Sequence, residues 1–150
     1  MPDSLSTAER IEIERACERL VYDYSRLLDL GEMSRAADFF ALNGSLARPM
    51  APDAVIQGRE AIRASLITRP KTLLTKHLAT NVTIDVEGRD AASGLSYLTM
   101  ISCTPGEAKA PFVSQGPIYF GEFRDRFVRE EGVWRFLERR GSIQMKFSGG

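Results

Sequence analysis

Three side chains in this sequence have the chemistry needed for proton transfer: Tyr24, Asp29 and His77, the last being the only histidine in the chain. A carboxylate that accepts a hydrogen bond from one imidazole nitrogen fixes the tautomer and raises the basicity of the other nitrogen. Asp29 falls in the last turn of an expected helix, where the helix dipole disfavours a carboxylate by about 0.3–1 kcal/mol. A compensating partner is therefore expected, and an Asp29–His77 pair would form a positioned general base.

Tyr24 adds a phenolic donor that could polarise a carbonyl or stabilise an enolate oxygen. It also falls on the apolar stripe of the same helix, so it equally fits a core position, as His77 fits a half-buried structural one. On a straight helix, the five residues from Tyr24 to Asp29 separate the two side chains by about 140°. They converge on one site only if the helix bends or the ligand wraps around its end.

The first half of the chain predicts three helices. Ser6 and Glu9 have capping-box spacing, apolar residues then recur every three or four positions, and Gly31 can end the helix in a left-handed conformation. A short helix is expected over 32–44, ending at an Asn43–Gly44 turn, and a third over 58–70.

The second half predicts strands, because the pattern changes to alternation and to β-branched and aromatic residues. Strands are expected over 77–88 and 91–103, followed by a hairpin over 117–147 that turns near Glu131–Gly132. The proline- and glycine-containing connection over 104–116 could cover an opening. These elements predict an α+β cone, three N-terminal helices packed into a curved, mostly antiparallel sheet, as a single domain over residues 1–150.

Composition narrows the function classes. The 150 residues include 20 basic and 20 acidic side chains without a block of either sign, which argues against nucleic acid and anionic membranes as partners. No signal-peptide pattern or membrane-length apolar stretch is present, and Cys17 and Cys103 fit small buried hydrophobes, so a cytoplasmic protein is expected. No metal-ligand cluster or phosphate-binding glycine motif is found, so we expect no cofactor and no metal.

The element order and several motifs together resemble the SnoaL-like branch of the NTF2-like, cystatin-fold superfamily. The motifs that carry the resemblance are YSRLLDLGEMSRAADFFA, GREAI, KHLATNVTIDVEG and FRDRFVREEGVWRFLERR. The family includes scytalone dehydratase, bile-acid 7α-dehydratase, a dehydrochlorinase and polyketide cyclases. The resemblance implies catalytic roles for Asp29, His77, Tyr24 and Arg140, with Arg139 as the alternative arginine because one residue reverses the face of a strand.

The resemblance implies a cofactor-independent lyase or isomerase of the dehydratase type, acting on a small hydrophobic cyclic carbonyl compound. The alternatives are a non-catalytic binding or accessory protein and a polyketide cyclase. It also implies a homodimer or homotrimer. The residues expected to contact the ligand are apolar or match the family's H-x-x-x-N pattern: Phe40, Met50, Asn81, Tyr97 and Phe120.

Overall fold

The computed structural model describes residues 4–114 and 116–149. Its elements are α1 (Thr7–Asp29), α2 (Met33–Ala37), β1 (Phe40–Arg48), β2 (Ala51–Gln57), α3 (Arg59–Leu66), β3 (Leu74–Val86), β4 (Ala91–Cys103), β5 (Ile118–Glu130) and β6 (Val133–Phe147). The strands form one six-stranded sheet in the order β2-β1-β6-β5-β4-β3. All neighbours are antiparallel except β1 and β6, which are parallel.

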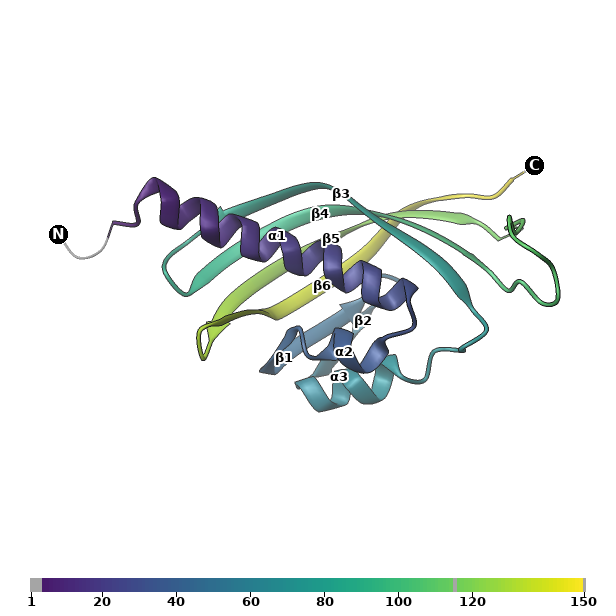
Figure 1. Ribbon diagram of the computed structural model, residues 1–150, viewed down its shortest axis with the longest axis horizontal. Coiled ribbons are helices and arrows are strands. Elements are labelled where there is room, and N and C mark those ends of the chain that lie inside the picture. The colour runs from purple at the N-terminus through teal and green to yellow at the C-terminus, as the bar shows by residue number, and fades with distance from the viewer. Residues whose placement is uncertain (1–3, 115, 150) are drawn as a thin grey trace.

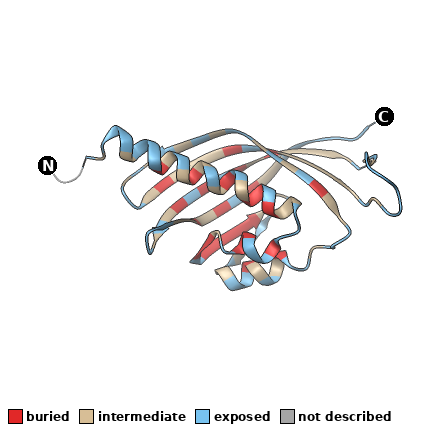
Figure 2. Ribbon diagram, in the orientation of Figure 1, coloured by how far each residue is buried: buried red, intermediate tan, exposed pale blue. Residues whose placement is uncertain are grey.

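The sheet curves, and α1 lies across its inner face while α2 and α3 pack at the β1–β2 end (Figure 1). This arrangement confirms the expected α+β class and the curved, mostly antiparallel sheet, whereas the expected three N-terminal helices are only partly matched, because β1 and β2 come before α3. Buried residues concentrate on the side of α1 that faces the strands and along β1 (Figure 2). Within the described part of the chain, no helix has the length and apolarity needed to cross a membrane.

Helix α1 begins and ends as its sequence predicts. The Glu9 N–H donates to Ser6 Oγ, and the Ser6 N–H donates to Glu9 Oε2, which completes the capping box. Gly31 has a φ of 76°, and the N–H groups of Gly31 and Glu32 donate to the carbonyls of Leu28 and Leu27. This C-terminal turn fixes the direction in which the chain leaves the helix after Asp29, the last helical residue.

Two strands, β1 and β2, were not predicted, and they separate α2 from α3. The predicted helix over 32–44 was wrong beyond Ala37, because Phe40 begins β1 and pairs with Phe136 of β6. Asn43 and Gly44 form no hairpin turn; they lie where β1 departs from regular pairing with β6. A Cβ at Gly44 would lie 2.9 Å from the Ala41 carbonyl oxygen, so this irregular stretch requires glycine. A pairing partner almost a hundred residues away thus overrides the local helical preference.

The connection between β4 and β5 was expected to cover an opening in the cone. The structure shows it extending from the far end of those strands (Figure 1). None of its described residues, 104–114 and 116, lines the main cavity described below. The segment that borders the cavity is instead the one between α3 and β3, including Thr68, Arg69, Pro70 and Leu73.

Candidate active site

Asp29 and His77 lie in direct contact. His77 Nδ1 is 2.5 Å from Asp29 Oδ1, and the two side chains are only 11% and 12% exposed, respectively for His77 and Asp29. The backbone N–H of His77 also donates to Asp29 Oδ2 at 2.9 Å. The end of α1 and the beginning of β3 are therefore joined through one carboxylate, which orients both the main chain and the ring of His77.

The Asp29 carboxylate is stabilised in its ionised form. Burial alone would raise its pKa, but hydrogen bonds from the His77 side chain, the His77 N–H and Thr75 Oγ1 outweigh burial and lower the pKa. Thr75 Oγ1 donates to Asp29 Oδ1 at 2.8 Å. These donors, which come from β3, compensate the unfavourable position at the negative end of the α1 dipole.

Arg69 extends this network. Its Nη2 donates to Thr75 Oγ1 at 2.5 Å and its Nη1 to the Leu28 carbonyl at 3.0 Å. Burial lowers the pKa of Arg69, while the charge of Asp29 raises it. Arg69 and Asp29 thus balance each other's charge through Thr75, and Arg69 acts as a positioning residue for the pair.

The ionised carboxylate determines which nitrogen of the neutral ring carries the proton. An ionised carboxylate only accepts hydrogen bonds, so Nδ1 must donate to it. In the neutral ring this leaves Nε2 with a free lone pair. Because His77 lines the main cavity, this arrangement can abstract a proton from a bound molecule.

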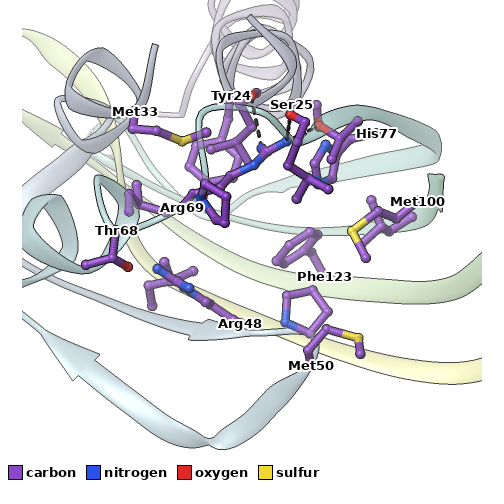
Figure 3. Close-up of a pocket in the computed structure, with 18 residues that line it drawn as sticks. Tyr24, Ser25, Met33, Arg48, Met50, Thr68, Arg69, His77, Met100 and Phe123 are labelled. Carbon is purple, nitrogen blue, oxygen red and sulfur yellow. Dashed lines mark hydrogen bonds between the residues drawn. The ribbon is translucent and has the colours of Figure 1, made fainter. Parts of the chain in front are cut away.

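The main cavity has a volume of about 360 Å³ and lies between α1, α3 and the sheet (Figure 3). Its walls are mostly aliphatic, aromatic and thioether groups, which suits an apolar ligand. The polar side chains in its lining are few: Tyr24, Ser25, Arg48, Thr68, Arg69, Thr75 and His77. A second, more open cavity on the other side of His77 is lined by Asp29 and charged groups such as Arg19 and Lys76.

Tyr24 lines the main cavity although its residue is only 3% exposed. Its ring packs edge-on against Phe40 and Phe136, with centroids 5.8 and 5.7 Å apart. Burial raises the pKa of its hydroxyl, and the charges of Arg139 and Arg48 only partly oppose that rise. The phenol therefore remains protonated and available as a donor. Tyr24 lines the main cavity and Asp29 lines the second cavity, five residues further along α1. Both can serve one site because His77, the partner of Asp29, lines both cavities.

The prediction that Arg140 is the arginine of the site was wrong, because the arginine that points inward is Arg139. Arg140 is exposed and pairs with Glu138 at 2.6 Å, whereas Arg139 is fully buried. A bulge causes the difference: Phe136 pairs with Phe127 and Glu138 with Arg126, so Leu137 is an extra residue that shifts the alternation of β6.

Arg139 lies behind the cavity wall. Its guanidinium carbon is 4.7 Å from the Tyr24 ring centroid and 3.8 Å from that of Phe123, both of which line the cavity. Its Nε is 3.4 Å from Oδ1 of the buried Asp125. Burial raises the pKa of Asp125 to about 6, and Arg139 acts in the opposite direction. Arg139 thus influences the site through the rings it contacts.

Of the five residues expected to contact a ligand, only Met50 lines the main cavity. Phe40 is fully buried in the core instead. Tyr97 is 51% exposed and points to the outer face, because its strand neighbours Ser96 and Leu98 are the buried ones. The prediction was therefore wrong for Phe40 and Tyr97.

Asn81 and Phe120 also lie outside the cavity lining. Asn81 is exposed and has a φ of 51° at a bulge in β3, where two residues oppose one residue of β4. Asparagine tolerates this left-handed conformation, so its place in the H-x-x-x-N pattern has a backbone explanation. Phe120 is half-buried next to a register shift between β5 and β6.

Arg48, Arg69 and Thr75 were not identified from the sequence. Thr75 could have been found, because it lies two residues before His77 and so shares its face of the strand. Arg48 ends β1 and Arg69 lies between α3 and β3, so only the folded chain brings them to the cavity. In residues 4–114 and 116–149 there is no group of three or more His, Cys, Asp or Glu side chains placed to hold a metal ion.

Comparison with known proteins agrees with this architecture. A family model described as a SnoaL-like domain matches residues 9–140. Among proteins with curated annotation, no sequence matches.

Three solved structures illustrate the similarity. A provisionally assigned scytalone dehydratase from Novosphingobium aromaticivorans is 24% identical, with a TM-score of 0.80 over 97% of this chain and 93% of that one. A single-residue variant of Rv3472 from Mycobacterium tuberculosis, a protein of unknown function, is 26% identical, with a TM-score of 0.71 over 89% and 77%. A type 2 hexachlorocyclohexane dehydrochlorinase, LinA, is 16% identical, with a TM-score of 0.79 over 97% and 94%.

Proposed function

Because this chain belongs to the SnoaL-like domain family, which its NTF2-like, cystatin-like fold also reflects, we propose that it is a cofactor-independent lyase or isomerase of the dehydratase type. Its substrate would be a small hydrophobic cyclic compound with a carbonyl group. The observation that carries the proposal is the 2.5 Å contact between Asp29 Oδ1 and His77 Nδ1 at the wall of an apolar cavity. Similarity to a dehydratase and a dehydrochlorinase is consistent with elimination chemistry.

In the proposed reaction, His77 Nε2 removes a proton from the carbon next to the carbonyl, and the C–H electron pair forms an enolate. Asp29 stabilises the positive charge that the imidazole gains. In a dehydratase, the enolate then expels a β-hydroxyl, which takes the proton from His77 and leaves as water. In an isomerase, His77 returns the proton to another carbon.

Tyr24 would donate a hydrogen bond to the carbonyl oxygen as negative charge develops there. Its raised pKa keeps the hydroxyl protonated, and the nearby charge of Arg139 favours the negative oxygen. Arg139 is a positioning residue in this scheme, because it packs on the Tyr24 ring and does not line the cavity.

Hydrogen–deuterium exchange tests the proton-abstraction step without the natural substrate. The probe is 2-tetralone, a bicyclic ketone with acidic α-protons, incubated in D₂O and followed by proton NMR. The wild-type protein should accelerate α-exchange above the buffer rate, and His77→Gln should reduce the enzymatic part by about 10²–10⁴-fold. Equal exchange by both proteins would refute the proposal and favour a non-catalytic binding role.

We also propose that the chain acts as a single domain in a homodimer or homotrimer. Leu78 and Tyr97, on the outer face of neighbouring strands, are 47% and 51% exposed, which suits contact with another subunit. Light scattering on the eluting protein would measure the mass directly. A monomeric mass at micromolar concentration would contradict the proposal.

A further inference from the structure

The charged side chains that line the main cavity are all positive. Arg48 and Arg69 contribute two guanidinium groups, and no aspartate or glutamate among the described residues is part of the lining. The surrounding groups are mostly apolar, so these charges act in a medium of low polarity where an unbalanced charge is costly. The two arginines differ in how far the protein balances them.

Arg69 is balanced by the protein itself. Both of its terminal nitrogens donate to protein oxygens, on Leu28, Leu73 and Thr75, and the charge of Asp29 acts on it. Arg69 therefore needs no ligand to satisfy its hydrogen bonds or to balance its charge.

Arg48 is held in place but not balanced. Its Nη2 donates to the carbonyl and Oγ of Ser65 at 2.6 and 2.7 Å. Among the residues that the structure describes, its Nε and Nη1 have no hydrogen-bond partner and no carboxylate pairs with it. Pro49 follows it and packs so closely on Gly141 that a Cβ there would clash, which fixes the turn that carries Arg48. The guanidinium is thus preorganised with unused donors.

Figure 3 shows Arg48 and His77 on opposite sides of the open space, with Phe123 and Met50 along one wall. An anion bound by Arg48 would place the apolar body of a ligand between these groups, with its other end near His77 and Tyr24. Guanidinium is well suited to carboxylates, because its N–H groups match the two oxygens. A cavity of about 360 Å³ suits a ligand of two fused rings.

We propose that the ligand of this cavity is an apolar ring compound that carries a carboxylate, and that Arg48 binds this carboxylate at the end opposite His77. The inference names the substrate class of the site and rests on the proposed function for the reacting carbonyl near His77. The carboxylate itself takes no part in the reaction; it selects the ligand and sets its orientation.

Equilibrium binding separates this inference from catalysis. The probes are 2-naphthoate and its neutral counterpart 2-naphthamide, measured by calorimetry at pH 7 with wild type, Arg48→Gln and Arg140→Gln. Wild type should bind naphthoate about 10- to 100-fold more tightly than the amide, as expected for a charge-assisted hydrogen bond in a partly buried site. Arg48→Gln should remove this preference, and Arg140→Gln, which deletes an exposed arginine, should keep it.

A wild-type protein that binds the amide as tightly as naphthoate, or that binds neither at millimolar concentration, would overturn the inference. A preference that survives in Arg48→Gln would do the same. If that variant fails to fold, the Arg48 Nε–H resonance of the wild type decides: it should shift on adding naphthoate and not on adding naphthamide, and equal responses would refute the role. His77→Gln should lose tetralone exchange but keep the preference for naphthoate. The exchange assay therefore tests the proposed function, and the binding assay separately tests the role of Arg48.

Discussion

The Asp29→Asn substitution tests the role of the carboxylate, because it keeps the shape of the side chain and removes its charge. The amide oxygen can still accept hydrogen bonds, but the amide no longer requires the proton on His77 Nδ1 and no longer stabilises a charged imidazole. A triad aspartate replaced in this way in a serine protease costs about 10⁴-fold in turnover. We therefore expect the enzymatic exchange of 2-tetralone to fall by about 10²–10⁴-fold.

The effect of Asp29→Asn on stability follows from the same contacts. The carboxylate accepts from Thr75 Oγ1, His77 N and His77 Nδ1, and each hydrogen bond to a charged group contributes about 1.5–3 kcal/mol. The amide retains part of this and relieves the unfavourable interaction with the α1 dipole, worth about 0.3–1 kcal/mol. The net loss in the free energy of unfolding should be about 2–3 kcal/mol, measured by urea denaturation.

The matched control is Thr75→Val, which removes one donor to Asp29 and leaves the contact with His77. It should reduce the free energy of unfolding by about 1.5–3 kcal/mol, the contribution of one hydrogen bond to a charged group, and it should reduce the exchange of 2-tetralone far less than Asp29→Asn does. If Asp29→Asn retains exchange within about threefold of wild type while remaining folded, the carboxylate does not support a catalytic histidine.

Further predictions concern the residues around the pair. Tyr24→Phe should lower exchange by about 10²-fold without unfolding the protein, and an unchanged rate would remove Tyr24 from the mechanism. Arg139→Gln should cost about 3–5 kcal/mol in urea denaturation, because it leaves Asp125 buried and unpaired, whereas Arg140→Gln should change stability by less than about 0.5 kcal/mol; similar values for both would contradict the inward placement of Arg139. Burial raises the pKa of Asp125 to about 6, so between about pH 4 and 6 the folded protein binds more protons at this residue than the unfolded chain does. The free energy of unfolding of the wild type should therefore fall by up to about 3 kcal/mol, relative to that of Asp125→Asn, as the pH rises through this range. Asp29 has the opposite sign: its lowered pKa stabilises the fold above about pH 4, and that contribution should disappear as the pH falls further, which Asp29→Asn should not show.

Local signals were sufficient for α1 and for the later strands. The Ser6–Glu9 box, the apolar stripe and Gly31 each act within a few residues, and the structure has all three. The contact between Asp29 and His77 was also expected, because a carboxylate at the negative end of a helix dipole needs a compensating partner and the family resemblance pairs these two residues.

The remaining features depend on long-range strand pairing and on strand bulges, which short stretches of sequence do not reveal. β1 forms because Phe40 pairs with Phe136 of β6, and no short window of sequence contains that information. The extra residue at Leu137 reverses the faces of Arg139 and Arg140, so the family resemblance, which favoured Arg140 and left Arg139 as the alternative, could not decide which arginine points inward. Arg48 reaches the cavity only because β1 is a strand, so missing the strand also meant missing the unbalanced charge.

Proton and nitrogen NMR of the imidazole ring report directly which nitrogen carries the proton, and the single histidine makes the spectrum unambiguous. At a pH where the ring is neutral, we expect the proton on Nδ1, seen as a low-field Nδ1–H proton resonance that disappears in Asp29→Asn, and an unprotonated Nε2 whose resonance shifts when a ligand enters the cavity. A ring protonated on Nε2, or a spectrum unchanged by Asp29→Asn, would refute the Asp29–His77 general base.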